Sequence, residues 1–467
     1  MRKYIYILFF VFLWAMWYFV YPYYLMWLEG AAFFSTLPDF TTIYFNLPED
    51  LFRYMGAFLL QFYAYPTIGA AIQALLPVLF VICIFSVIRR LFKESDGLLW
   101  IAFIALPVYV YCQLNDLTLT WSLTTLFAAA VVSLVARVST SAGQPFKKVP
   151  EIIRNRYVDL ALLAVSAVAT FFVITESNSM SHEYEDVAYL EHLAENGEWN
   201  EVLKAVPPQD AISNGYKRRY ALLALSQTNK LPDYAFRYGL SSSEDFLFYT
   251  FQEPYCLAFN VLFYRSLGVN NPAVYHLYQQ AIHSFPGLSF DLLRNLTDIY
   301  LEQKDYGLAK KYIDILSHST CHGKWIKERL PILESIRDEE PESSVNGEPY
   351  VLESFLTDLS YLVDRYPTNH RFADYLLCGV LAERDVNTFY NIFSITADSL
   401  YPGGEHIPVL YQEALLLIAN RNPEILHKYK IDEEVQKRFD SFTALMRNGK
   451  SAQAKREGAG TYWAYVN

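Results

Sequence analysis

The sequence predicts an all-α protein in which an N-terminal bundle of about five transmembrane helices precedes a stacked α-helical solenoid. Two observations support this prediction. Long apolar runs dominate the chain up to residue 175, and charged and polar residues recur at helical intervals after it. The later helices are short, amphipathic and paired. Because such a pair buries its apolar stripe only against a neighbouring pair, a solenoid is the simplest arrangement.

Five stretches are apolar enough for a bilayer core, which needs about 20 residues in a helix and accepts about 17. They cover residues 4–28, 67–88, 98–114, 117–136 and 157–175. The first is long, aromatic throughout and free of a small-residue cleavage site, so we expect an uncleaved anchor rather than a signal peptide. The third is short and contains Pro107.

Residues 37–66 lie between the first two stretches and combine acids with aromatics and prolines. Their apolar part, residues 51–66, is short for a crossing, and we expect an interfacial or re-entrant segment that ends at Pro66. A crossing here is the alternative. It would make the number of spans even and the C-terminal half cytoplasmic.

The distribution of basic residues opposes that alternative, because short loops rich in Lys and Arg stay in the cytoplasm. With the N-terminus inside, ten of the eleven basic residues in residues 1–175 fall on the cytoplasmic side, and only Arg53 falls outside. Residues 176–467 then lie beyond the membrane. In a bacterium this predicts an inner-membrane protein with a periplasmic C-terminal domain.

Composition also limits the partners. Residues 176–467 hold 40 acidic and 27 basic residues, a net charge of −13. Such a surface disfavours nucleic acid and adhesion to anionic lipid. The five cysteines form no Cys-x-x-Cys pair, and we expect buried free thiols; whether Cys256, Cys321 and Cys378 ever pair stays open.

The clearest helix pair is LLRNLTDIYLEQKDYGLAKKYIDIL, residues 292–316. Its spacing resembles a tetratricopeptide repeat, and residues 271–286 resemble a second repeat helix. The expected packing positions are Leu293, Leu296, Tyr300, Tyr306 and Ala309 in the first, and Tyr278, Ala281 and Pro286 in the second. We expect a transmembrane domain over 1–175, repeat blocks over 176–335 and 351–467, and a loop at 336–350. The aromatic C-terminal tail should pack on the last helices.

Motifs for chemistry are scarce. The sequence has no Walker loop, dinucleotide-binding glycine fingerprint, HExxH helix or GxSxG elbow. His283, His318 and His322 lie near the best repeat without acidic neighbours at ligand spacing, and we expect them to be solvated or to line a groove. No cofactor or metal is expected.

The acids of residues 37–66 are the single catalytic candidate. By position, this segment resembles the first outer loop of multispanning polyprenyl-dependent glycosyltransferases, where catalytic or metal-binding acids occur. The resemblance implies Asp39 as general base, Glu49 or Asp50 on a divalent ion, and Arg53 on the phosphate of a polyprenyl-linked substrate. The alternative, which we favour, is that LPDF and LPED are helix starts in which acids meet the helix dipole.

Together, the five spans, the stretch GAFLLQFYAYPTIGA and the helical repeats resemble an uncharacterised family of polytopic membrane proteins from Bacteroidota. The family implies a compartment and no activity. We therefore expect a non-enzymatic inner-membrane platform whose periplasmic repeats bind a protein or peptide of an envelope assembly. The alternative is a glycosyltransferase-like or envelope-lipid transferase that uses residues 37–66. Transport is disfavoured because the spans lack buried charges.

Overall fold

The computed structural model describes the chain except for residues 1, 44–47, 93–97, 140–154, 178, 250–253, 284–286, 340, 342–353, 405, 421 and 467. The described residues form helices and no β-strand, which confirms the all-α class. They divide into two compact units. Unit 1 comprises Met1–Tyr189 and Ser284–Glu342, and unit 2 comprises Leu190–His283 and Ser343–Asn467.

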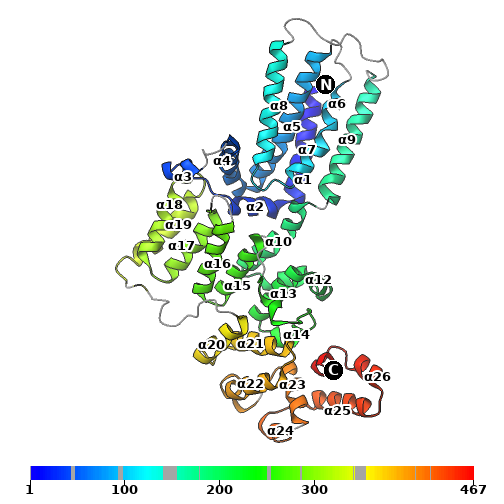
Figure 1. Ribbon diagram of the computed structural model, residues 1–467, viewed down its shortest axis with the longest axis vertical. Coiled ribbons are helices and arrows are strands. Elements are labelled where there is room, and N and C mark those ends of the chain that lie inside the picture. Colours follow the sequence, from blue (N-terminus) through cyan, green and yellow to red (C-terminus); the bar gives the residue numbers. More distant parts are fainter. Residues whose placement is uncertain are drawn as a thin grey trace. The chain divides into compact units, whose positions relative to one another are not determined.

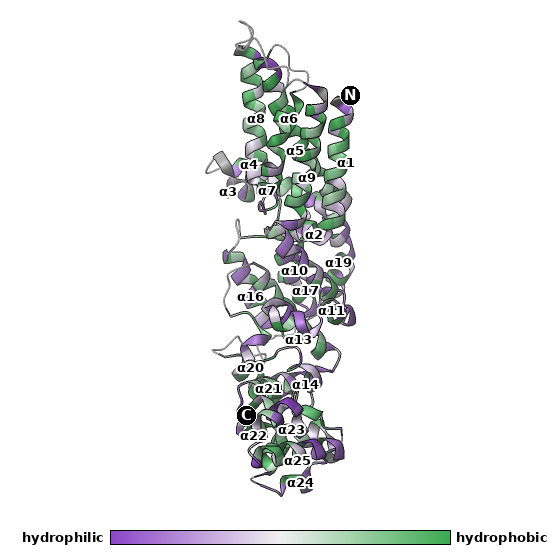
Figure 2. Cartoon of the chain, turned by 90° about the vertical axis from the view of Figure 1, so that its right-hand side faces the viewer, coloured by the Kyte–Doolittle hydropathy of each residue, from purple (hydrophilic) through white to green (hydrophobic). Residues whose placement is uncertain are grey.

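Unit 1 is built on a bundle of apolar helices (Figure 1). Among the described residues, four helices are long and apolar enough to cross a membrane, which indicates a membrane protein. They are α1 (Arg2–Val20), α5 (Pro66–Leu91), α8 (Thr120–Ser139) and α9 (Arg156–Glu176). Figure 2 shows hydrophobic residues along these helices, and many of their large apolar side chains are exposed, as lipid-facing residues should be.

Over the residues that it describes, the structure has four candidate spans where the sequence predicts five, and the first of them ends at Val20 rather than at residue 28. The predicted span that is missing from the four is 98–114. Residues 98–114 form two short helices, α6 (Leu99–Ile104) and α7 (Leu106–Gln113), with Ala105 between them. Pro107 lies in the first turn of α7. A proline cannot donate to the carbonyl four residues earlier, here Phe103, and its ring crowds that carbonyl, so the helix breaks. The freed Phe103 carbonyl accepts a hydrogen bond from Ser166 Oγ of α9 at 2.6 Å.

The chain turns sharply after α1 into α2 (Pro22–Ala31), whose N-cap residue Tyr21 makes no side-chain capping bond. Glu185 of α10 (Met180–Glu195) replaces that cap. Its carboxylate accepts the backbone N–H of Tyr24 at 2.7 Å and that of Tyr23 at 3.4 Å. These amides belong to the first turn of α2, which has no intrahelical acceptors for them.

Residues 37–66 form α3 (Pro38–Ile43), α4 (Pro48–Leu60) and the 3₁₀ helix η1 (Gln61–Ala64). Helix α4 packs on the turn before α8 through Gly56, where a Cβ atom would lie 2.1 Å from the Thr118 carbonyl oxygen. It packs on α8 itself through Phe52, whose ring centroid lies 5.3 Å from that of Phe127. None of these helices is among the four candidate spans. The interfacial or re-entrant placement of this segment stays a prediction.

Unit 1 also contains a three-helix segment from the C-terminal half of the sequence. It consists of α17 (Phe290–Glu302), α18 (Tyr306–Ser317) and α19 (Gly323–Ser335), which we call the docked helices. Helices α17 and α18 pack against each other, and the rings of Tyr300 and Tyr312 stack at 5.8 Å. The expected boundaries at residues 175, 335 and 351 were drawn from composition and stay predictions. Compactness instead groups the docked helices with the membrane bundle.

Unit 2 is a set of short helices that pack as neighbouring pairs, notably α15 with α16, α20 with α21 and α21 with α22. The regular stacking expected of a solenoid stays a prediction. The C-terminal aromatics pack as expected, since Tyr462 and Trp463 are buried, the latter with Phe439 and Phe442. Its helices are α11 (Trp199–Ala205), α12 (Pro208–Ser213), α13 (Gly215–Gln227), α14 (Leu231–Tyr234), η3 (Ser243–Phe246), α15 (Pro254–Ser266), α16 (Asn270–His283), α20 (Phe355–Arg365), α21 (His370–Ala382), α22 (Val386–Leu400), η5 (Pro402–Gly404), α23 (Val409–Ala419), α24 (Ile425–Lys428), α25 (Glu433–Arg447), α26 (Ser451–Glu457) and α27 (Tyr462–Val466).

Candidate functional site

The acidic segment that the sequence singles out is only partly assembled. Asp39 is exposed on α3, whereas Asp50 on α4 is buried and pairs with Arg53 at 3.3 Å. Glu49 lies in α4, and its side chain is outside the described residues. The structure thus brings Asp50 and Arg53 together as an i,i+3 pair on one helix, a geometry that stabilises the helix itself. The catalytic roles of these four residues stay predictions.

A more elaborate set of contacts joins the docked helices to the segment that follows α1. The Phe290 N–H donates to the Ala32 carbonyl at 2.9 Å, and the Thr36 N–H donates to the His318 carbonyl at 3.3 Å. In addition, Gln61 Oε1 accepts both the backbone N–H of Thr320, at 3.0 Å, and its hydroxyl, at 2.8 Å. We call these contacts, together with the close approach of Gly30 to Asp291 and the pair of Glu29 with His322, the junction.

Gly30 allows the close approach at the junction. A Cβ atom at this position would lie 1.9 Å from Oδ2 of Asp291, far inside van der Waals contact. Asp291 stands in the first turn of α17 and pairs with Arg294 at 3.0 Å. A side chain at residue 30 would therefore force the Asp291 carboxylate to move away from α2.

At the centre of the junction, Glu29 and His322 form a buried pair. Glu29 Oε1 lies 2.5 Å from His322 Nε2, and the other ring nitrogen, Nδ1, lies 2.9 Å from Ser319 Oγ. The imidazole stacks on the Phe290 ring with centroids 3.7 Å apart and planes 10° apart. His322 is only 5% exposed and Glu29 only 9%. The ring is thus held on both edges and on one face.

This corrects one expectation for the histidines. His283 and His318 are exposed, in agreement with the prediction of solvated side chains. His322 is neither solvated nor without an acid, because its carboxylate partner is 293 residues away in the sequence. The one available signal was Glu29 itself, a lone acid in the apolar run YLMWLEGAAFF, where a carboxylate needs a partner.

The predicted repeat-packing residues fall into three groups. Leu293, Leu296 and Ala309 are buried between α17 and α18, and Tyr300, Tyr306 and Ala281 are half-buried. Tyr278 is exposed on α16, and Pro286 lies outside the described residues. The helix pair at 292–316 is present, and its membership of a repeat series stays a prediction.

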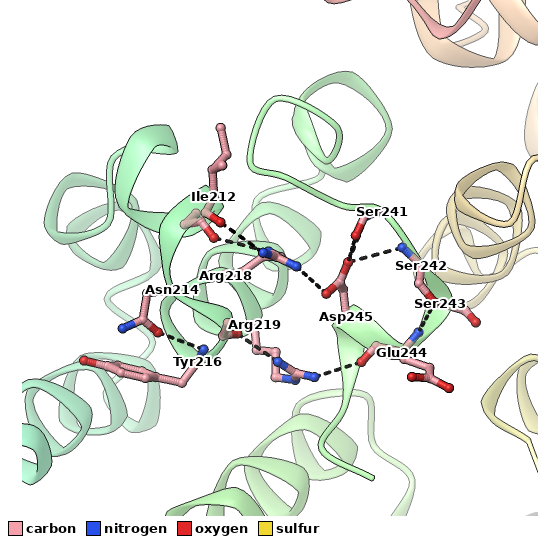
Figure 3. A network of polar contacts seen from close by, with 12 residues as sticks. Ile212, Asn214, Tyr216, Arg218, Arg219, Ser241, Ser242, Ser243, Glu244 and Asp245 are labelled. Atoms are coloured by element: carbon pink, nitrogen blue, oxygen red, sulfur yellow. Dashed lines mark hydrogen bonds and ion pairs between the residues drawn. The ribbon is translucent and has the colours of Figure 1, made fainter. Parts of the chain in front are cut away.

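In unit 2, two consecutive arginines of α13 hold the 241–247 segment (Figure 3). Arg218 donates to Asp245 at 2.5 Å and to the carbonyls of Ala211 and Ile212 at 3.2 and 3.1 Å. The second carboxylate oxygen of Asp245 accepts the N–H and the hydroxyl of Ser241 at 2.9 and 2.8 Å. Arg218 thus ties two segments of unit 2 to one helix.

The guanidinium group of Arg219 donates its hydrogen bonds, among the described contacts, to backbone carbonyls. It donates to the carbonyls of Gly215, Glu244 and Leu247 at 2.9, 3.0 and 2.9 Å, and its guanidinium carbon lies 4.2 Å from the centroid of the Phe248 ring. Burial lowers the pKa of Arg219 from its ordinary value. The carbonyl acceptors and the nearby negative charge of Asp245 together compensate this desolvated cation, which indicates a structural clamp.

Three acids have raised pKa values because their surroundings desolvate the charged carboxylate; Asp374 and Glu413 are buried, and Glu185 is half-buried. Burial raises the pKa of Glu185 to about 7, against the lowering effect of the Tyr24 and Tyr23 amides. It also raises the pKa of Asp374 to about 7, although Tyr411 donates to that carboxylate at 2.8 Å. The pKa of Glu413 rises to about 7 for the same reason, opposed by the Tyr462 amide and by Arg438. Each of these carboxylates accepts a hydrogen bond that joins two segments of the chain, from Tyr24, Tyr411 and Tyr462 respectively.

Within the part of the chain that the structure describes, no group of three or more His, Cys, Asp or Glu side chains is arranged to hold a metal ion. Cys83, Cys112, Cys256, Cys321 and Cys378 are free thiols; Cys256 and Cys378 are buried, and the other three are half-buried.

The chain belongs to a family of unknown function, DUF6057, whose model matches residues 1–149 and 149–467. This agrees with the expectation of an uncharacterised family. No curated protein and no solved structure is similar enough to match the chain.

Proposed function

We propose that this member of a family of unknown function is a membrane-anchored platform whose helical part binds a protein or peptide partner. The junction is the observation that supports the proposal. Two backbone hydrogen bonds, the Gln61–Thr320 contacts and the buried Glu29–His322 pair hold the docked helices on the membrane anchor. A set of helices fixed in this way can present a binding surface at a constant height above a bilayer.

The proposed location is a bacterial inner membrane, as in the Bacteroidota proteins that the sequence resembles. The N-terminus lies at the same end of the bundle as the C-terminal ends of α5 and α8 (Figure 1). Arg89, Arg90 and Arg137 are in the last turns of those helices. Because basic residues stay inside, this end is cytoplasmic and the junction is periplasmic in our proposal. This orientation requires an odd number of passes, so we propose that α6–α7, which is too short to count among the four candidate spans, crosses the apolar layer as a broken helix.

Unit 2 carries a candidate binding groove between α25, α26 and α27. It is a cavity of about 290 Å³. Phe442, Leu445 and Trp463 supply its apolar lining, and Lys437 and Glu434 are among the charged side chains at its edge. An apolar floor with charges of both signs at the rim suits a peptide that inserts one apolar side chain.

Photocrosslinking tests the binding proposal. A benzophenone amino acid replaces Ser441, which lines the groove, and in a matched variant it replaces Asp338, which is exposed in unit 1. We expect a discrete protein adduct in cells from position 441 and none from position 338. Equal adducts at both positions, or none at 441, would contradict the platform proposal at this groove.

Topology is tested separately with Ser335→Cys, because Ser335 is exposed at the end of α19. A membrane-impermeant maleimide should label this variant in spheroplasts above the level of the parent chain, whose native cysteines are buried or half-buried. Protection until the cells are lysed would place the junction in the cytoplasm and overturn the proposed orientation.

A further inference from the structure

We propose that Ser319, His322 and Glu29 form a nucleophilic relay that hydrolyses a carboxylic ester at the membrane surface. A serine hydroxyl is a weak nucleophile, and enzymes activate it with a base within hydrogen-bond reach that a third group orients. Both contacts are present here, with Ser319 Oγ 2.9 Å from His322 Nδ1 and Glu29 Oε1 2.5 Å from Nε2. This activity is independent of partner binding by unit 2.

The chemistry of the carboxylate fixes the roles of the two ring nitrogens. An ionised Glu29 can only accept, so the proton of the neutral imidazole lies on Nε2. Nδ1 then carries the lone pair, and it faces the Ser319 hydroxyl. Serine proteases use the two nitrogens in the opposite order, but either nitrogen can serve as the base when the other is held by a carboxylate.

The base is rigid and the nucleophile is accessible. His322 is buried between its two partners and stacks on Phe290, whereas Ser319 is half-buried and reaches solvent. Helix α19 begins at Gly323, and its N-cap residue His322 makes no side-chain capping bond. A Cβ atom at Gly323 would have no neighbour within 4 Å, so open space adjoins the first turn. The N–H groups there have no intrahelical acceptor and would stabilise an oxyanion.

The reaction balances with water as the second substrate. Ser319 Oγ attacks the ester carbonyl carbon while Nδ1 of His322 takes the hydroxyl proton. The C–O bond to the leaving alcohol breaks, the alcohol takes that proton, and an acyl-Ser319 remains. Water then attacks the acyl carbon and gives a proton to Nδ1, which returns it to Ser319 as the carboxylic acid leaves.

The surroundings favour an ester carried by a lipid. Thr320, next to the nucleophile, binds Gln61, the first residue of η1, which directly follows α4. Helix α4 exposes Leu51, Met55 and Phe58, which recur at a spacing of one helical face. Beside this face, Phe52 of α4 contacts the exposed Phe127 of the membrane helix α8, with ring centroids 5.3 Å apart. An acyl chain could lie along this apolar face while its ester reaches Ser319.

A fluorophosphonate probe tests the relay, since it reacts with activated serines. Purified full-length protein is treated with the probe, and the modified peptide is located by mass spectrometry. We expect one adduct, on Ser319, and its loss in Ser319→Ala. Ser317→Ala is the matched control, because Ser317 is exposed and bonds only the Asp314 carbonyl among the described contacts. It should be labelled like the parent.

Further variants separate an activated serine from a merely reactive one. Glu29→Gln should slow labelling at least tenfold and change the pH profile of the labelling rate, with an unchanged elution volume on size exclusion. Gly323→Leu fills the open space and should also slow labelling. No adduct on Ser319 in the parent, or labelling that is equally fast in folded Glu29→Gln, would overturn the relay.

The source of the ester is decided by two substrates, phosphatidylcholine vesicles and p-nitrophenyl acetate. Fatty acid release from vesicles that Ser319→Ala abolishes would support a lipid substrate. Turnover of the soluble ester alone would keep the relay and overturn the lipid assignment. Turnover of neither would overturn the activity, whereas the crosslinking from position 441 would still test the platform.

Discussion

Glu29 and His322 meet in a buried contact of 2.5 Å although 293 residues separate them in the sequence. Glu29 belongs to the segment that leaves the first membrane helix, and His322 occupies the N-cap position of α19 in the C-terminal half. Neither the charge nor the hydropathy of a local stretch of sequence identifies Glu29 and His322 as partners of each other. Removing one partner of a buried pair leaves the other unsatisfied, which is strongly destabilising. The pair therefore fixes the register in which the docked helices lie on unit 1.

The contact of Gln61 with Thr320 should contribute measurably to the same docking. Gln61→Leu keeps the approximate volume but removes the acceptor of two Thr320 hydrogen bonds; because Thr320 is exposed, the junction should lose only their net contribution, about 0.5–1.5 kcal/mol for each bond. Hydrogen exchange of the amides in residues 318–322 should become at least tenfold faster. Gln436→Leu is the control, because Gln436 bonds only an exposed Asp440 among the described contacts. Unchanged exchange in Gln61→Leu would mean that the contact adds nothing to docking.

The bond from Ser166 to the Phe103 carbonyl should depend on Pro107. Ser166→Ala removes the hydroxyl that donates to this carbonyl and should destabilise the bundle by about 1 kcal/mol, a typical value for a hydrogen bond between membrane helices. In a Pro107→Ala background the restored N–H can reach the same carbonyl, so the second substitution should have a smaller effect. A double-mutant cycle on denaturation in detergent measures the difference. Strict additivity would contradict the assignment.

Hydropathy was sufficient for four of the membrane helices because each is continuous and apolar over at least 18 residues. It failed at residues 98–114, where composition is apolar but Pro107 interrupts the backbone hydrogen bonds. The helix pair at 292–316 was also predictable, since its leucines follow the helical period. The segment of unit 1 on which this helix pair packs was not predictable. The spacing of apolar residues identifies the buried face of a helix, but it does not identify the surface that covers that face.

The same limit applies to the candidate site. Asp39, Glu49, Asp50 and Arg53 attracted attention because they are close in sequence, whereas the contacts at Glu29, Ser319 and His322 are tertiary. His322 was expected to be solvated or to line a groove, since no acid stands at ligand spacing from it in the sequence. A buried carboxylate in an apolar run requires a partner, and that rule, applied to Glu29, was the one sequence signal for the junction.

Arg219 should resist replacement by lysine. Lysine cannot form three hydrogen bonds in the planar arrangement that the carbonyls of Gly215, Glu244 and Leu247 require, and it loses the stacking on Phe248. We expect Arg219→Lys to destabilise unit 2 by at least about 2 kcal/mol. Thermal unfolding of the full chain measures this, with Arg447→Lys, an exposed position, as the control. Equal melting temperatures for the two variants would show that the clamp is dispensable.

Asp374 should make the stability of unit 2 depend on pH. Burial raises its folded-state pKa to about 7, from an ordinary value of 3.8, so the folded chain holds a proton that the unfolded chain has released between these limits. The free energy of unfolding should therefore fall as pH rises from about 4 to about 7, by a few kcal/mol at most.

Asp374→Asn keeps an acceptor for the Tyr411 hydroxyl and removes the titration. As pH rises through this window, the stability of the variant should increase relative to that of the parent. Below pH 4 the stabilities of the two proteins should change with pH in the same way. Thermal unfolding in detergent at several pH values between 4 and 8 measures both curves. Parallel curves would show that the Asp374 carboxyl titrates at its ordinary value despite its burial.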